Sequence, residues 1–277
     1  MRLLKQLVAV AAVAFVGSMG VGAVQGNTLL TLILGVATAV LAVFVYARVV
    51  RWSERREPVE VATKGAAAAV GRGTLIGIGM FVAVIANIAV LGGYRVVGQG
   101  SVSGAVALFG FMAAAAVTEE LIFRGILFRI IEERAGTWPA LTLTSLLFGL
   151  SHLFNPNASL WGAIAIAIEA GAMLAAAYAA TRTLWVPIGL HFGWNFAAAG
   201  IFSTEVSGNG ATEGLLHGAT SGPALLTGGG FGPEASPYAV AFGALLTIVF
   251  MWLARRRGNL VPRRRGARTD ATATLSQ

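Results

Sequence analysis

The sequence has no cysteine and little charge. The absence of Cys from its 277 residues excludes disulfides and thiolate chemistry. Only 12% of the residues are Asp, Glu, Lys or Arg, whereas about 25% is usual in a soluble domain. The hydrophobic share is 56%. This composition excludes an ordinary soluble domain and predicts a helical membrane protein.

Long apolar runs supply the membrane-spanning segments. A helix of about 20 apolar residues crosses the roughly 30 Å hydrocarbon core of a bilayer. Glycines in one run, including Gly77 and Gly79, permit close approach between helices. The first run resembles a signal peptide, but it is long for one and lacks a small-residue cleavage site, so we expect it to be retained. We predict an all-α, polytopic bundle of about eight spans, over residues 3–21, 29–50, 74–97, 102–131, 137–154, 159–180, 184–202 and 238–254.

The basic residues indicate the orientation of the bundle. Nearly every Lys and Arg outside the spans falls in the loops after the second, fourth and sixth spans or in the tail, and only Arg95 falls on the other side. The positive-inside rule then places both termini in the cytoplasm. The formal net charge of +8 is therefore explained by topology and by anionic membrane lipids rather than by nucleic acid.

The chain divides into four parts. Residues 1–72 hold two spans and a basic cytoplasmic loop, whose charge cluster at 51–58 we expect to be solvated. Residues 73–203 form the helical core, and residues 204–237 form a Gly-rich non-cytoplasmic loop. Residues 238–277 hold the last span and a basic cytoplasmic tail that we expect to be disordered. We expect the loop to be a mobile linker, with a lid over a substrate as the alternative.

One apolar span carries a cluster of three charges. Glu119, Glu120 and Arg124 interrupt residues 102–131, although a charge at the bilayer centre costs roughly 2.5–3.5 kcal/mol on insertion scales. Glu120 and Arg124 are four residues apart and share a helix face, so we expect them to pair. Glu119 lies about 100° away around the axis and is the freer carboxylate. Such charges usually mark function; an ion pair that only joins two helices is the alternative.

Later spans add polar residues to the same apolar background. His152 follows Phe148 by four residues, and Asn195 follows His191 by four, which places this second pair on one helix face. At about 1.5 Å per residue, Glu119 and His152 lie roughly 20 Å from the cytoplasmic ends of their spans, but His191 only about 10 Å. A further acid, Glu169 in the sixth span, is equally consistent with a buried structural hydrogen bond and with a role at the site.

The order Glu-Glu-x-x-x-Arg, Phe-x-x-x-His and His-x-x-x-Asn resembles the CAAX-protease and bacteriocin-processing (CPBP, or Abi) family of intramembrane proteases. All three motifs are intact within residues 102–202. The resemblance implies an active site inside the membrane and a peptide or membrane-protein substrate. Eukaryotic relatives remove the last three residues of prenylated proteins; here a prenylated protein, a bacteriocin-like peptide or another membrane protein stays open. The composition fits a bacterial plasma membrane. The implied catalytic residues are Glu119, Glu120, Arg124, His152, His191 and Asn195.

Peptide hydrolysis without a Ser or Cys nucleophile requires an activated water. Glu119 suits the general base, with His152 helping to hold the water and with His191 and Asn195 donating to the oxyanion. Arg124 and Glu120 would support this carboxylate. Ser151 points about 100° away from His152 on a helix, which disfavours a Ser–His dyad.

A metal is the rival means of activating water. Glu119, His152 and His191 would supply the three ligands of a catalytic divalent metal such as zinc, although the chain lacks a His-Glu-x-x-His helix.

Two competing functions use the same buried charges. A transporter or proton relay predicts an inverted internal repeat, which the sequence does not show. A catalytically silent membrane partner predicts the loss of a motif residue, and none is lost.

Overall fold

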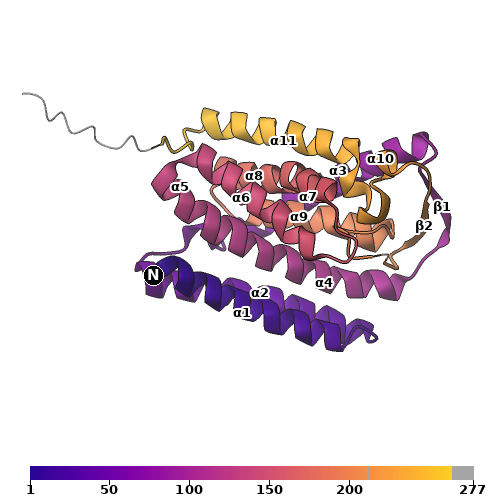
Figure 1. Ribbon diagram of the computed structural model, residues 1–277. Helices are drawn as coiled ribbons and strands as arrows, with labels where there is room; N and C mark the ends of the chain where they lie inside the picture. The colour runs from indigo at the N-terminus through magenta and orange to yellow at the C-terminus, as the bar shows by residue number, and fades with distance from the viewer. Residues whose placement is uncertain (211, 264–277) are drawn as a thin grey trace, which may run out of the picture.

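The computed structural model describes residues 1–210 and 212–263 and shows a bundle of helices (Figure 1). The predicted all-α membrane bundle is confirmed. The predicted tail is not disordered at its start, since α11 runs to Arg256 and Val261 exchanges hydrogen bonds with Thr137; its part from residue 264 onward lies outside the described residues. The α-helices are α1 (Arg2–Ala23), α2 (Thr28–Glu54), α3 (Ala66–Val90), α4 (Val102–Glu120), α5 (Arg129–Ala135), α6 (Thr137–Ser151), α7 (Leu160–Ile166), α8 (Met173–Thr181), α9 (Trp185–Asn195), α10 (Ala224–Thr227) and α11 (Pro237–Arg256).

Three π-helical segments interrupt or extend these helices. The segment η2 (Leu121–Phe128) joins α4 to α5, η4 (Ala167–Ala172) joins α7 to α8, and η5 (Phe196–Ile201) continues α9. Short 3₁₀ turns are η1 (Val59–Val61), η3 (His152–Phe154), η6 (Gly229–Phe231) and η7 (Pro233–Ala235).

Six segments of the described chain are long and apolar enough to cross a membrane: Arg2–Ala23, Thr28–Glu54, Ala66–Val90, Val102–Ala135, Leu160–Thr181 and Pro237–Arg256. They correspond to six of the eight predicted spans, and they make the chain an integral membrane protein. The other two predicted spans are helical but shorter. α6 has 15 residues, and α9 has 11 residues before η5 continues it.

The third span ends earlier than the predicted residue 97. α3 ends at Val90, and the strand β1 (Tyr94–Gln99) comes next. Gly92 has a φ of +77°, a conformation that favours glycine and turns the chain out of the helix. β1 pairs antiparallel with β2 (Leu216–Thr220), far away in the sequence. Because β1 forms only by pairing with a distant strand, the local sequence gives no sign that the helix ends before it.

The segment 204–237 is not a mobile linker. It contains β2, α10, η6 and η7, and it caps one end of the bundle (Figure 1). Phe231 and Glu234 in this segment are only 3% and 2% exposed. The prediction was wrong because the glycines serve structured turns here, as at Gly228 and Gly232, whose φ angles are +82° and +102°.

The N-terminus and the end of α11 lie at the same end of the bundle, opposite β1 and β2 (Figure 1). At that end, Arg129 lies 2.8 Å from Glu54, and Arg56 lies 2.6 Å from the same carboxylate. The charge cluster at 51–58 is therefore not simply solvated, since the Glu54 side chain is only 3% exposed. Shared ion pairs draw the Glu54 carboxylate inward.

Glycines bring α3 and α9 into backbone contact. A Cβ added to Gly77 would lie 2.2 Å from the Leu190 carbonyl oxygen, and one added to Gly193 would lie 2.3 Å from the Thr74 carbonyl oxygen. Small residues at such spacings allow membrane helices to approach closely. The predicted close approach is therefore confirmed at Gly77, but a Cβ on Gly79 would meet nothing within 4 Å. This contact fixes the rotation of α9.

We predict opposite effects for Gly77→Ala and Gly79→Ala. The first adds a methyl group against the Leu190 carbonyl and should destabilise the fold by about 1–3 kcal/mol. The second should be neutral or stabilising by up to about 1 kcal/mol, because alanine favours helix. Thermal unfolding in detergent measures both. Equal midpoints for the two variants would contradict the proposed role of the α3–α9 contact.

Candidate active site

A fully buried arginine joins three parts of the bundle. The Arg124 side chain is 0% exposed, and its Nη1 donates to Glu120 Oε1 at 2.6 Å. Its Nη2 donates to the carbonyls of Ala170 and Gly171 in η4, at 3.1 and 3.0 Å. Its Cζ lies 4.5 Å from the ring centroid of Phe148 on α6, a cation–π geometry. The predicted Glu120–Arg124 pair is confirmed, whereas its ties to η4 and α6 were not predicted.

Glu120 links the first motif to the third. Its Oε1 also lies 3.0 Å from Nδ1 of His191, and both side chains are buried. An ionised carboxylate can only accept hydrogen bonds, so Nδ1 of His191 carries the hydrogen. The Glu120 carboxylate thereby sets the ring orientation of His191 and turns Nε2 toward Glu119.

Glu119 is the freer carboxylate of the pair, as the helix geometry predicted. Its side chain is 34% exposed, and its Oε2 lies 3.8 Å from His191 Nε2. That separation is too long for a direct hydrogen bond and is one that a bridging water can span. Within the described protein, this buried oxygen has no hydrogen-bond partner. Glu119 therefore presents an unengaged acceptor beside His191.

His152 begins the 3₁₀ turn η3 rather than lying inside a helix. Its Nδ1 lies 2.7 Å from the Phe148 carbonyl oxygen, which can only accept, so Nδ1 donates; in the neutral ring Nε2 then keeps its lone pair. The Ser151 hydroxyl donates to the same carbonyl at 2.7 Å. Because Nδ1 of His152 is occupied in this way, the arrangement again disfavours a Ser151–His152 dyad.

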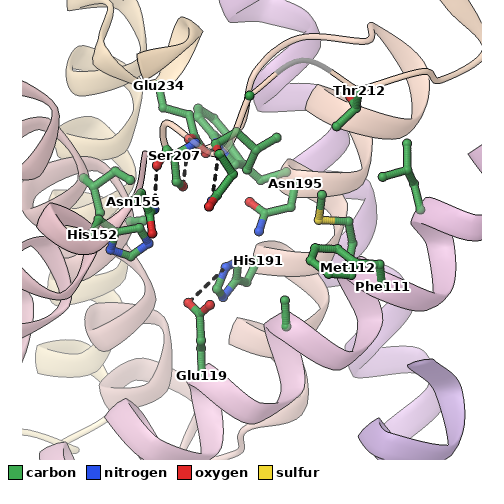
Figure 2. Close-up of a pocket in the computed structure, with 18 of the residues that line it drawn as sticks. Phe111, Met112, Glu119, His152, Asn155, His191, Asn195, Ser207, Thr212 and Glu234 are labelled. Atoms are coloured by element: carbon green, nitrogen blue, oxygen red, sulfur yellow. Dashed lines mark hydrogen bonds and ion pairs between the residues drawn. The ribbon is translucent and has the colours of Figure 1, made fainter. Parts of the chain in front are cut away.

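The polar side chains of all three motifs meet at one cavity. Glu119, His152, His191 and Asn195 line a cavity of about 970 Å³ (Figure 2). His191 was expected to lie nearer the cytoplasmic end of its span than Glu119 and His152, but it lines the same cavity as they do. Glu120 and Arg124 do not line the cavity; they lie behind this wall, fully buried.

Sequence reasoning missed Glu234, which closes the cavity from η7. Trp194 Nε1 donates to Glu234 Oε1 at 2.8 Å. The backbone N–H and the hydroxyl of Ser207 both donate to Oε2, and the Asn155 amide donates to the Ser207 carbonyl at 2.6 Å (Figure 2). Burial raises the pKa of the Glu234 carboxyl, and its hydrogen bonds oppose that rise. Nothing in its Gly-rich sequence surroundings signals this position.

The three π-helical segments all lie at the site. η2 starts directly after Glu120, η5 starts directly after Asn195, and η4 contains Glu169. Such local departures from the α-helix occur frequently at functional sites. A pattern that repeats every 3.6 residues cannot predict them, because the π-helical turn replaces that period only locally.

The described residues contain no group of three or more His, Cys, Asp or Glu placed to hold a metal ion. Glu119, His152 and His191 share the cavity wall, but they do not form such a ligand cluster. The zinc site stays a prediction.

The fold and the site define an integral membrane helix bundle with carboxylate, imidazole and amide groups around an internal cavity. Residues 101–197 match the family model described as Type II CAAX prenyl endopeptidase Rce1-like. This segment is thus similar to the CPBP intramembrane proteases, and the predicted resemblance is confirmed. No curated protein and no solved structure matched the chain. The matched segment contains every predicted site residue, but Glu234 lies beyond it.

We predict that Arg124→Met destabilises the protein strongly. Removing one partner of a buried ion pair typically costs about 3–5 kcal/mol, because the other charge stays buried alone. The double variant Glu120→Gln/Arg124→Met should recover part of that loss, since the lone carboxylate is gone. The midpoints of thermal unfolding in detergent are compared for the two single variants and the double variant. If the loss of stability in the double variant equalled the sum of the losses from the two single substitutions, the coupling between Glu120 and Arg124 would be contradicted.

Proposed function

We propose that this intramembrane endopeptidase hydrolyses peptide bonds with a water that Glu119 activates. One observation carries the proposal: the buried, unengaged Oε2 of Glu119 lies 3.8 Å from His191 Nε2 on the wall of the shared cavity. A water between these two atoms would have both an acceptor for its proton and a second polar contact. Positioned carboxylates serve as general bases in this way.

The residues around that water divide the remaining work. As the water oxygen attacks the carbonyl carbon, Glu119 takes the proton, and the carbonyl oxygen becomes an oxyanion. The Asn195 amide and a protonated His191 donate hydrogen bonds to that oxygen, a contribution of about 10²–10³-fold for each donor. The Nε2 lone pair of His152 accepts the second hydrogen of the water. Glu119 then returns its proton to the leaving amine as the C–N bond breaks.

Glu120 and Arg124 act as positioning residues in this proposal. Glu120 holds Nδ1 of His191 at 3.0 Å, and Arg124 holds the same carboxylate oxygen at 2.6 Å. Catalytic geometry that is held within fractions of an ångström accounts for a large share of enzymatic rate. The two residues thus fix His191 without touching the substrate.

The proposed substrate is a membrane-associated protein or peptide. The family name suggests a prenylated C-terminus, whereas a bacteriocin-like peptide or another membrane protein would meet the same groups. Leu108, Phe111 and Met112 line the cavity on the α4 side and suit an apolar chain. We place the protein in a bacterial plasma membrane with both termini in the cytoplasm and with anionic lipids at its basic end. The support is the positive-inside rule together with the shared end of the N-terminus and α11 (Figure 1).

We predict that Glu119→Gln lowers the cleavage rate by about 10²–10⁴-fold, the usual contribution of a general base. Membranes from cells that carry the wild type or the variant are compared for new protein termini by mass spectrometry. Glu57→Gln is the matched control, because the Glu57 side chain is 72% exposed and lies in the loop after α2. Identical sets of termini from the wild type and Glu119→Gln would overturn the proposal.

We predict that metal chelators leave the rate of the purified, lipid-reconstituted enzyme unchanged, because the proton passes through Glu119. Cleavage of a substrate found by the comparison of termini is measured before and after treatment with 1,10-phenanthroline. A loss of activity that added zinc restores would instead support the set Glu119, His152 and His191 as ligands.

A further inference from the structure

Apart from the histidines, the ionisable side chains that line the cavity are all acidic. Four glutamates line it: Glu119, Glu169, Glu213 and Glu234. Among the described lining residues there is no lysine and no arginine. Arg124 is the buried cation behind the wall, and its hydrogen bonds go to Glu120 and to two backbone carbonyls. The proposed hydrolysis uses only Glu119 of the four acids.

Glu169 is the least satisfied of these acids. Its side chain is fully buried, at 0% exposure, and neither of its carboxylate oxygens has a hydrogen-bond partner within the described protein. Burial of a polar group without a partner costs several kcal/mol on most scales, and a charge costs more. Glu169 therefore needs a donor or a cation that the cavity itself does not provide.

The position of Glu169 is held firmly by its neighbours. The carbonyls of Ala170 and Gly171, the next two residues in η4, accept hydrogen bonds from Arg124. On the other side, a Cβ added to Gly243 of α11 would lie 2.3 Å from Glu169 Cα. Backbone contact with α11 and hydrogen bonds from Arg124 thus fix the segment that carries this carboxyl.

Glu234 makes a useful contrast within the same cavity. Its two oxygens accept from Trp194 and from two groups of Ser207, so its hydrogen-bonding capacity is largely used by the protein. It still adds a negative field to the cavity. Glu169, by comparison, has two buried oxygens that no donor of the described protein satisfies.

We propose that Glu169, in the field of Glu234, binds a cationic side chain of the substrate, a lysine or an arginine close to the scissile bond. This inference rests on the proposed function. An ammonium or guanidinium group would give Glu169 the charge-assisted hydrogen bonds that it lacks. The acidic lining would repel an aspartate, a glutamate or a terminal carboxylate at the same place. The apolar wall on α4 would take the neighbouring apolar residues.

The test uses quenched-fluorescent peptides with the lipid-reconstituted enzyme. One apolar peptide sequence is made with Lys, Gln or Glu at each position within a few residues of its central bond, and kcat/KM is measured for each. We expect one position at which Lys is preferred over Gln on the order of 10-fold, with Glu the poorest. In Glu169→Gln the Lys-to-Gln ratio should fall toward one, whereas Glu57→Gln should keep the wild-type ratio.

The outcomes separate this inference from the proposed function. Equal cleavage of Lys, Gln and Glu peptides by the wild type overturns the cationic subsite and leaves the protease function intact. A Lys preference that persists in Glu169→Gln overturns the assignment to Glu169. No cleavage of any peptide by the wild type overturns the proposed function and the inference with it. Glu169→Met serves as a second variant, in which the Lys-to-Gln ratio of kcat/KM should also fall toward one. If neither variant folds, the wild-type peptide series alone still decides whether a cationic side chain is preferred.

Discussion

The site depends on one carboxylate oxygen that is shared between two cationic or hydrogen-donating groups. Glu120 Oε1 accepts from Arg124 at 2.6 Å and from His191 at 3.0 Å, with Glu120 and Arg124 fully buried. In a low-dielectric interior each of these contacts is strong, but the cost of removing the charges from water is also high. Apolar residues of similar volume would often be as stable. An arrangement of this kind is therefore better explained by what it positions, which is His191, than by stability.

Backbone geometry places the same groups. The glycines at the α3–α9 contact bring the two helices together on one face of α9, and His191 and Asn195 line the cavity. The π-helical segment η2 begins directly after Glu120 and contains Arg124, and η5 begins directly after Asn195. Each π-helical turn rotates the residues after it relative to a regular helix, so the functional residues and the packed helix ends can satisfy different neighbours.

The sequence allowed the prediction of those features that are local. Glu120 and Arg124 pair because four residues of helix bring their side chains together, and the apolar runs predict helices wherever they are long enough. The contacts of Glu234 with Trp194 and Ser207 join residues 40 and 27 positions apart in the chain, and β1 pairs with a strand that lies beyond the helices from α4 to α9. Neither the Glu234 contacts nor the β1–β2 pairing produces a periodic pattern in the sequence, and both involve a segment rich in glycine turns. The motif residues on the helices were thus predictable, but the segment that carries Glu234 was not.

The sign of the charge in the cavity limits what the proposed enzyme can cut. A peptide bond near the end of a chain brings a terminal carboxylate into the cavity, whereas an internal bond brings only neutral amides. With four glutamates in the lining and no lysine or arginine among the described lining residues, a terminal carboxylate would meet repulsion in the proposed enzyme, which a protonated histidine would offset. His191, held by Glu120 at 3.0 Å and lying 3.8 Å from Glu119, is the histidine that the proposed mechanism places at the oxyanion. In that proposal one imidazole would serve both the oxyanion and a nearby chain end.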